Sequence, residues 1–377
     1  MALIKIKSPL AGAARPLTTS MDHDSADLGT IWSSAWGQAH RPSPTMSWDI
    51  VPVDGTTPVF PENPDTVGRV FVATAPESTV FFGIEADSAY VGSAYVDHIY
   101  AGSGDDFILA GAGDDLVSGG AGDDIVYGQA GSDRITDGAG ADRIYGDSGD
   151  DYLISTGKQD EALGFGADGP DLFAGGSGND WVSYAFANEG ATASLADSSR
   201  NGGAAEGDRF ESIENLAGSQ HGDWLMGNAG ANTLVGDAGD DLLEGAAGND
   251  ALHGDNGNDN LNGGDGEDTL FGGAGDDALT GEAGADRMFG DDGNDIFLGL
   301  DGGDFVSGGS GFDSVVLDGS AADWTLEDMG TVLGADGITE THLYELRQIQ
   351  ADGSHGERIY LDSIEQLRFG DDTLLYL

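Results

Sequence analysis

The chain has 377 residues, and its 68 acidic residues against 14 lysines and arginines give a formal net charge of −54 at pH 7. A charge of this sign repels nucleic acids and anionic membranes, which excludes both as partners. The absence of cysteine excludes disulfides and thiolate metal sites, and no stretch reaches the ~20 apolar residues that span a bilayer.

Residues 1–82 form a non-repetitive N-terminal module whose role the sequence does not reveal. Its many prolines break up any long helix. From Arg69 onward the pattern becomes strand-like, with apolar runs at residues 70–72 and 80–82. The triplet Asp22-His23-Asp24 fits either a metal or catalytic site or a solvated turn. We favour the turn, because no partner constellation follows it.

Residues 83–183 follow a nine-residue period. Glycine prevails at positions 1 and 4 of each unit, an acid at position 6 and an apolar residue at position 8. Two degenerate units, with Asp97 in register, precede six clean units over 101–154. An interruption at 155–165 separates them from two more units at 166–183. A fixed short period of this kind indicates a solenoid.

Residues 184–217 break the period and form an insert. The insert ends near the sequence Ser-Ile-Glu-Asn-Leu at 212–216, and a similar Ser-Ile-Glu-Gln-Leu occurs at 363–367. We expect each copy to place a strand against the end of a stack of repeats. The first copy would end the first block of repeats, which we call the first roll, and the second copy would end the second roll. The alternative interpretation is that the two five-residue sequences are similar by chance, because short similarities of this kind are common.

The period returns in residues 218–316, which divide into eleven units of nine with no residue left over. Position 6 is aspartate in every unit except one, where Asn232 replaces it. Residues 317–377 then lose the period and alternate as strands at 343–349, 358–361, 364–369 and 373–377. A solenoid needs a cap on its open end, and this last segment is expected to supply it.

Each position of the repeat has a physical role. The glycines permit a positive φ, so the first six residues form a tight turn, and the last three form a short strand whose position-8 side chain points inward. Stacked coils therefore bring the position-6 carboxylates close together, with almost no lysine or arginine between them to offset their repulsion. A hard divalent cation that accepts carboxylate and carbonyl oxygens in irregular geometry is calcium.

The pattern Gly-Gly-x-Gly-x-Asp-x-apolar-x, present in nineteen units in register, resembles the nonapeptide of the repeats-in-toxin (RTX) family. The resemblance implies an all-β fold: a right-handed parallel β-roll, or calcium-binding β-solenoid, in two blocks with a hairpin-bearing insert and a C-terminal β cap. It also implies multiple Ca²⁺ ions, held between successive turns by loop carbonyls and position-6 aspartates. The expected metal ligands are Asp106, Asp115, Asp124, Asp133, Asp142, Asp151, Asp171, Asp180, Asp223, Asp241, Asp250, Asp259, Asp268, Asp277, Asp286, Asp295, Asp304 and Asp313. The calcium-free chain is expected to be largely disordered.

The same resemblance implies export through a type I secretion channel, directed by an uncleaved C-terminal signal. The acidic-then-apolar end of the chain, residues 370–377, is similar to such signals. The N-terminus does not look like a cleaved secretory signal, because Lys5, Lys7, Pro9 and Arg15 interrupt its apolar residues. We therefore expect a secreted or cell-surface protein.

Enzyme motifs are missing from the sequence. There is no His-Glu-x-x-His metalloprotease motif, and the seven histidines never pair at i, i+4. There is no Gly-x-Ser-x-Gly nucleophile elbow, and His221 at position 4 of its unit is interpreted as a degenerate loop residue. We expect a non-enzyme with a structural or interaction role at the cell surface or in the matrix. The alternative is an enzyme, toxin or adhesin whose active module lies unrecognised in residues 1–82.

An outward apolar stripe is predicted on the first roll. It comprises positions 7 and 9 of alternate units: Phe107, Leu109, Ile125, Tyr127, Arg143 and Tyr145. The second roll is polar at comparable places, at His253, Asn260, Asn262 and Thr269. An exposed apolar stripe marks a contact face, for self-association or for a cell-surface partner. We favour slightly a third interpretation, in which the N-terminal strands around Phe71 and Phe81 fold back over it.

Overall fold

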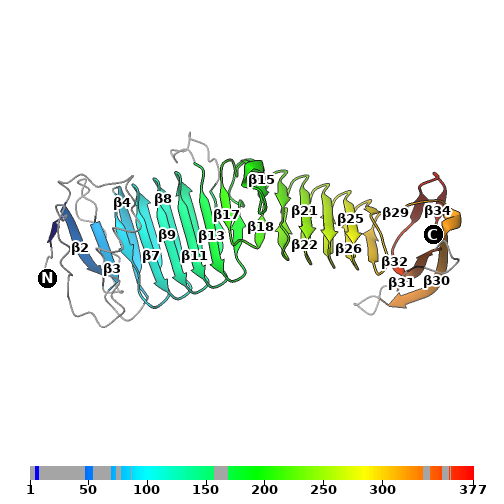
Figure 1. The fold of residues 1–377 in the computed structure, drawn as a ribbon, viewed down its shortest axis with the longest axis horizontal. Coiled ribbons are helices and arrows are strands. Elements are labelled where there is room, and N and C mark those ends of the chain that lie inside the picture. Colours follow the sequence, from blue (N-terminus) through cyan, green and yellow to red (C-terminus); the bar gives the residue numbers. More distant parts are fainter. Residues whose placement is uncertain are drawn as a thin grey trace.

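The computed structural model describes residues 5–7, 47–53, 69–73, 78–85, 87–156, 169–333, 340–349, 356 and 358–377. The triplet Asp22-His23-Asp24 lies outside the described residues, so its interpretation stays untested. The described chain is almost entirely β-strand, with short 3₁₀ helices at Ser198–Arg200 (η2) and Ala321–Asp323 (η3). It forms an elongated parallel β-solenoid of about 13 turns, which confirms the predicted fold class (Figure 1).

Three sheets build the solenoid, and we name them A, B and C. Sheet A consists, in spatial order, of β1 (Lys5–Lys7), β2 (Ser47–Val53), β3 (Arg69–Ala73), β5 (Ala89–Val91), β7 (Phe107–Ala112), β9 (Ile125–Ala130), β11 (Arg143–Ser148), β13 (Leu172–Ser177) and β17 (Arg209–Glu211). Sheet C consists of β16 (Gly202–Gly203), β15 (Ala191–Ser194), β19 (Trp224–Met226), β21 (Leu242–Ala247), β23 (Asn260–Asp265), β25 (Ala278–Ala283), β27 (Ile296–Leu298), β29 (Ser314–Leu317), β33 (Gln366–Phe369) and β34 (Leu374–Tyr376).

Sheet B runs along the other side of the solenoid for most of its length. Its strands are β4 (Val80–Glu85), β6 (His98–Ser103), β8 (Leu116–Ala121), β10 (Arg134–Ala139), β12 (Tyr152–Ile154), β14 (Trp181–Ser183), β18 (Asn215–Ala217), β20 (Thr233–Val235), β22 (Ala251–Asn256), β24 (Thr269–Ala274), β26 (Arg287–Asp292), β28 (Phe305–Ser310), β32 (Ile359–Asp362), β31 (Glu340–Gln348) and β30 (Trp324–Leu333). One coil contributes one strand to sheet B and one to sheet A or C.

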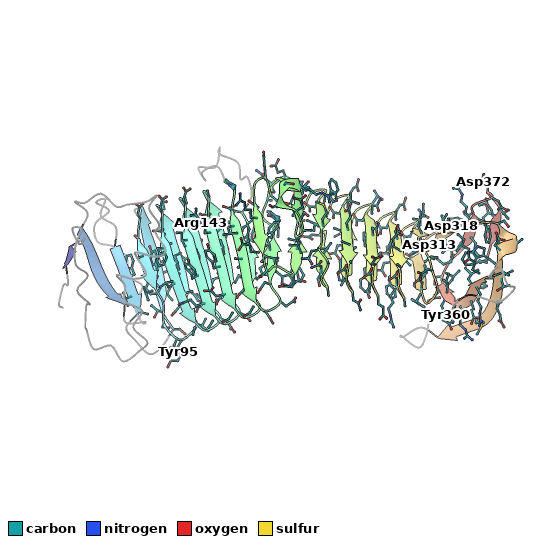
Figure 2. All side chains as sticks on the ribbon, viewed as in Figure 1. Tyr95, Arg143, Asp313, Asp318, Tyr360 and Asp372 are labelled. Carbon is teal, nitrogen blue, oxygen red and sulfur yellow. The ribbon has the colours of Figure 1, made fainter. Side chains whose placement is uncertain are left out.

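The core is a single file of position-8 side chains. Parallel pairing sets each residue beside the residue 18 positions later, for example Leu243 beside Leu261. The side chains at position 8 of the regular units are fully buried, so the apolar file sits between the two long sides of the solenoid. Tyr95, in contrast, is 47% exposed and lies at the lower edge of the solenoid in Figure 2.

The strands around Phe71 and Phe81 do not fold back over the first roll. β3 pairs in parallel with β5 and β4 with β6, so both strands extend the solenoid. Phe71 and Phe81 are buried against Tyr90, with the ring centroids of Phe71 and Tyr90 5.0 Å apart. The expectation that they cover the apolar stripe is therefore wrong: these rings fill the interior file where position 8 would be.

The insert lies where sheet A ends and sheet C begins, but sheet B passes through it. β18 pairs in parallel with β14 on one side and with β20 on the other. The strands flanking the first Ser-Ile-Glu copy, β17 and β18, lie on the coil formed by β13 and β14. The strands that flank the second copy are β32, which pairs in parallel with β28, and β33, which pairs in parallel with β29. Both copies thus lay strands on a coil, although the first leads into the next coil instead of ending the solenoid there.

The C-terminal segment covers the far end of the solenoid. β30, β31 and β32 are antiparallel to one another, and β34 is antiparallel to β33. Strands β31 to β34 match the four predicted ones, whereas β30 was not predicted. Within the described parts of the chain, no helix has the length and apolar character required to cross a membrane.

Candidate metal sites

The position-6 aspartates form ladders along the edges of the solenoid. In each ladder the backbone N–H of one aspartate donates to Oδ1 of the aspartate one coil later, as from Asp241 to Asp259 at 2.8 Å. These carboxylates are buried because the glycine-rich turns fold over them. One oxygen of each carboxylate therefore serves the protein backbone, which fixes where the second oxygen points.

The second carboxylate oxygen is left without a protein donor in fifteen of these residues. Each of these buried Oδ2 atoms has no hydrogen-bond partner in the described structure. They belong to Asp106, Asp115, Asp124, Asp133, Asp142, Asp151, Asp180, Asp241, Asp250, Asp259, Asp268, Asp277, Asp286, Asp295 and Asp313. A buried carboxylate oxygen without a partner is costly, so this regular set calls for a cation.

A space for a cation exists beside these oxygens. A Cβ built on Gly245, at position 1, would lie 2.5 Å from Asp250 Oδ2 and 2.6 Å from the carbonyl oxygen of Gly263. The bare glycine thus leaves a cradle between a carboxylate oxygen and the position-1 carbonyl of the next coil on the same edge. The same arrangement recurs at Gly254, next to Asp259 and Gly272.

The backbone at position 2 distinguishes these loops, which we call open loops. In all fifteen, position 2 has a positive φ, whether it is glycine, as at Gly264 (φ 101°), or a side-chain-bearing residue, as at Asp255 (φ 70°). Left-handed backbone is unfavourable for residues other than glycine. Aspartate, glutamate, glutamine and alanine nevertheless adopt it here, so the loop geometry overrides the local preference.

Burial makes the charged form of these carboxylates unfavourable. Desolvation, followed by neighbouring carboxylates, raises the pKa of Asp106 to about 10 and that of Asp124 to about 8. For Asp241, burial raises the pKa to about 7 despite the hydrogen bond from the Asp223 backbone. Ion pairs between described residues lie only within residues 345–372, such as Arg347 with Glu345 at 2.6 Å. No ion pair between described residues therefore involves a ladder aspartate.

These donors suit calcium. Among the described residues, no group of three His, Cys, Asp or Glu side chains is placed to hold a metal. An ion bound beside Oδ2 must therefore also use backbone carbonyls, and a site of mixed carboxylate and carbonyl oxygens with loose geometry is typical of Ca²⁺. The ion would neutralise the buried charge and join consecutive coils.

Four loops of the same length are different, and we call them closed loops. They occupy residues 92–97, 218–223, 227–232 and 299–304. In each, a loop N–H donates to the inner oxygen of the position-6 side chain, which is the oxygen that an open loop leaves without a donor. Ser219 N donates to Asp223 Oδ2 at 2.6 Å, and Asp301 N to Asp304 Oδ2 at 2.8 Å. Position 2 of these loops is not among the described residues with positive φ. The expected ligands Asp223 and Asp304 thus already have protein donors, unlike the fifteen aspartates above.

Three acidic residues that were not among the expected ligands also belong to the ladders. Glu214 and Glu365, one from each Ser-Ile-Glu copy, accept from the backbone N–H of Asp180 at 2.9 Å and of Asp313 at 2.8 Å. Asp208 accepts likewise from Asp171 at 2.9 Å. The recurrence of glutamate in both copies was the available signal for the first two. For Asp208 the signal was the sequence Asp208-Arg209-Phe210, which repeats the Asp-x-apolar pattern of positions 6 to 8.

The outward face carries two aromatic stripes. On sheet A, Phe107, Tyr127 and Tyr145 form a row, with the rings of Tyr127 and Tyr145 stacked at 4.7 Å. Phe107 is buried and the two tyrosines are half-buried, so this stripe is less exposed than predicted. On sheet B of the second roll, a stripe of His253, Phe271, Phe289 and Phe305 contradicts the expectation of a polar face, with neighbouring centroids 4.8–5.8 Å apart. Alternate units share a sheet, so position 9 of every second unit carried the signal for the first three rings, and position 7 of the next unit on that sheet carried it for Phe305.

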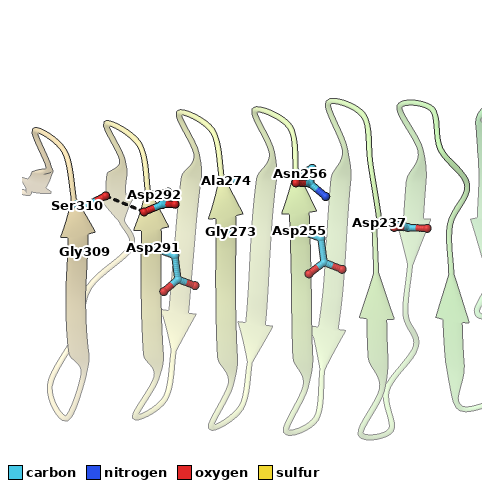
Figure 3. Close-up of a pocket in the computed structure, with 9 residues that line it drawn as sticks. All are labelled: Asp237, Asp255, Asn256, Gly273, Ala274, Asp291, Asp292, Gly309 and Ser310. Atoms are coloured by element: carbon cyan, nitrogen blue, oxygen red, sulfur yellow. Dashed lines mark hydrogen bonds between the residues drawn. The ribbon is translucent and has the colours of Figure 1, made fainter. Parts of the chain in front are cut away.

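The edge between sheets B and C carries a shallow acidic groove of ≈ 620 Å³ (Figure 3). Position-2 and position-3 residues line it, including Asp237, Asp255, Asp291 and Asp292, and Ser310 donates to Asp292 at 2.7 Å. This groove adds to the negative charge of the solenoid surface.

The family model described as "RTX calcium-binding nonapeptide repeat (4 copies)" matches residues 91–126, 127–157, 165–184, 218–252, 253–288 and 280–315. These ranges cover both repeat blocks and leave out the insert. No curated protein matches the chain.

Proposed function

The chain belongs to the RTX calcium-binding nonapeptide-repeat family, and from this premise we propose that it is a secreted protein whose solenoid folds when it binds extracellular calcium. The fifteen buried Oδ2 atoms without a protein partner carry the proposal. Twelve of them sit beside a position-1 glycine whose missing Cβ leaves a cradle for a cation, as at Gly245. Calcium is thus the structural cofactor, and its binding free energy becomes folding free energy.

The fold switch follows from linkage between binding and folding. Inside a cell, where calcium is scarce, repulsion among the carboxylates keeps the chain extended and competent for export through a type I channel. Outside, calcium binds the folded state far better than the unfolded chain, and the solenoid is stabilised in proportion to ion concentration. The net charge of −54 supports this direction, because self-repulsion opposes the compact state until cations bind.

The proposed role after folding is structural or interactive, at the cell surface or in the matrix. The two outward aromatic stripes support it, because ordered aromatic rows on a rigid sheet are suited to contact. The stripe of Phe107, Tyr127 and Tyr145 would meet either another copy of the chain or a surface partner. Light scattering during calcium addition separates the two, since only the first gives a mass increase with the chain alone.

Circular dichroism of the full chain during calcium titration tests the fold switch. We expect a disordered spectrum in chelator and a strand spectrum above a threshold of calcium, with magnesium as the matched control that fails to replace it, since Mg²⁺ demands a stricter octahedral site. Unchanged strand content after chelation would contradict the proposal. The rival proposal of an enzyme predicts hydrolytic turnover by the calcium-loaded chain that disappears when residues 1–46 are removed.

A further inference from the structure

The centre of the solenoid is built differently from the coils on either side. Residues 184–235, which we call the central segment, contain the insert and two consecutive closed loops, 218–223 and 227–232. Within the described chain, the fifteen open loops all lie outside this segment. The centre thus lacks the feature that makes the flanking coils depend on cations.

The buried acids of the central segment have protein donors on both oxygens. Asp208 accepts from the backbone of Asp171 at 2.9 Å and from the hydroxyl of Tyr184 at 2.7 Å. Asp223 accepts from the backbone N–H groups of Ala191 and Ser219, each at 2.6 Å. Backbone and hydroxyl groups here supply what a cation would supply in an open loop.

The second closed loop, residues 227–232, has no charge at position 6. Asn232 stands where every other unit of the second block has aspartate. Its Oδ1 accepts from Asn228 N at 2.8 Å, and its Nδ2 donates to the carbonyl of Glu214 at 2.7 Å. An aspartate has no donor for that carbonyl, so the amide joins the closed loop to the Ser-Ile-Glu copy in a way the consensus residue does not allow.

The central segment also has a denser apolar core. It buries eleven apolar side chains in 52 residues, against nine in the 81 residues of 236–316. Arg200 stacks over the ring of Trp224 at 4.8 Å, which adds one of the few cations in the chain. Five of the eleven are alanines, so the larger apolar side chains have about the same density in both regions. The additional buried alanines and the smaller unpaired charge favour folding without metal.

We propose that residues 184–235 form a calcium-independent folding nucleus, from which the calcium-dependent coils grow in both directions. This inference rests on the proposed function, since it divides the chain into parts that do and do not need the ion. The segment offers a strand edge to each half on sheet B: β18 pairs with β14 on one side, and β20 pairs with β22 on the other. Growth from a formed coil avoids the cost of nucleating a new one, as in other repeat proteins.

Hydrogen exchange read by mass spectrometry on the full chain tests the inference. In chelator, we expect peptides from 184–235 to stay protected while those from 101–154 and 236–298 exchange freely. Free exchange everywhere in chelator would overturn the nucleus and leave calcium-driven folding standing. Protection everywhere would overturn calcium-driven folding, and the distinct centre with it.

Asn232→Asp sharpens the test, because it restores the repeat consensus without changing the side-chain size. We expect the variant to exchange about tenfold faster or more across 184–235 in chelator, the effect of one lost buried hydrogen bond and one added charge, and to match the parent when calcium is present. The matched control is Asn249→Asp, the same chemical change at an exposed position 5 where aspartate is common. Equal protection of the two variants in chelator would contradict the role of Asn232.

Discussion

The loops 218–223 and 236–241 are neighbours on one edge of the solenoid and have the same length and the same final residue. The backbone of Asp223 even donates to Asp241 Oδ1 at 2.7 Å. Yet Asp223 Oδ2 accepts from Ser219 N, whereas Asp241 Oδ2 has no partner. The difference arises at position 2, where Asp237 has a φ of 78° and Ser219 does not adopt a positive φ.

This comparison shows that the position-6 aspartate alone does not define a metal site. A positive φ at position 2 turns its N–H away from the carboxylate, so the inner oxygen is left for an ion. A negative φ lets the N–H satisfy that oxygen, and the loop closes on itself. The choice between metal and backbone donor is therefore made within the loop, where the donor is position 2 in three closed loops and position 3 in 299–304.

The largest expected difference between the open-loop coils and the central segment is in how their stability depends on pH when calcium is absent. Burial raises the pKa of Asp115, Asp142 and Asp241 to about 7, above the ~3.9 of an unfolded aspartate. Between these values the folded state holds protons that the unfolded state lacks, so stability is gained as pH falls from 7 towards 4 and lost as pH rises through 7. Each titrating carboxylate contributes up to ~1.4 kcal/mol per pH unit.

We therefore expect the metal-free open-loop coils to fold near pH 5 and unfold near pH 8, as measured by circular dichroism in chelator. The central segment should respond less, because Asn232 does not titrate. With calcium present the order reverses: protons compete with the ion, and more calcium is needed below pH 7. A metal-free chain that is most ordered at alkaline pH would contradict the burial of these carboxylates.

Replacing the ligand in each kind of loop gives the next largest contrast. Asp259→Asn, in an open loop, should raise the calcium concentration at the folding midpoint at least about tenfold, the size seen even for outer-shell partners of metals. Asp223→Asn, in a closed loop, should raise it much less, because both Asp223 oxygens accept from protein donors and neither is left for an ion. Equal shifts for the two variants would remove the distinction between open and closed loops.

Filling a cradle is expected to have a moderate effect. Gly245→Ala places a Cβ 2.5 Å from Asp250 Oδ2, so we expect a loss of about 1–3 kcal/mol in the calcium-loaded chain, typical of overpacking. Gly230→Ala is the control in a closed loop, where the nearest atom is the exposed Asn228 Oδ1 at 3.2 Å. Thermal unfolding in calcium compares the two, and an unaffected Gly245→Ala would mean that no ion or close packing occupies the cradle.

The smallest expected effect is the conversion of a closed loop into an open one. The double variant Ser219→Gly and His221→Gly gives loop 218–223 the glycines of the consensus, which permit a positive φ at position 2. We expect one additional bound calcium by equilibrium dialysis, with little change in total stability. An unchanged stoichiometry would show that contacts from the insert, such as Ala191 N to Asp223 Oδ1, keep the loop closed.

Sequence reasoning predicts the fold well because the period specifies the register. A nine-residue repeat places Leu243 beside Leu261 and Asp241 beside Asp259 without further information. It does not distinguish Asp223 and Asp304 from the other aspartates, since the residue type is the same and the backbone at position 2 differs. His221 at position 4 and Leu300 at position 2 mark those loops as irregular, but irregularity alone does not reveal a donor.

The N-terminal coils were missed for a related reason. Phe71 and Phe81 occupy the interior file ahead of Tyr90, but no glycine lies between them in the sequence. The unit of Tyr90, in contrast, belongs to the two degenerate units predicted for residues 83–100. The aromatic stripe of Phe271 and Phe289 was missed because polar residues from both sheets were considered together. Sorting residues by sheet recovers it, since one coil contains two units.

The antiparallel strand β34 has a consequence for how molecules meet. A solenoid that stopped at β33 would present a parallel strand edge at this end of sheet C, onto which another copy could pair in the same direction. β34 runs antiparallel to β33, and on sheet B β31 runs antiparallel to β32. A second copy that met this end of sheet C would therefore have to pair with a reversed strand, so it could not continue the parallel register of the coils.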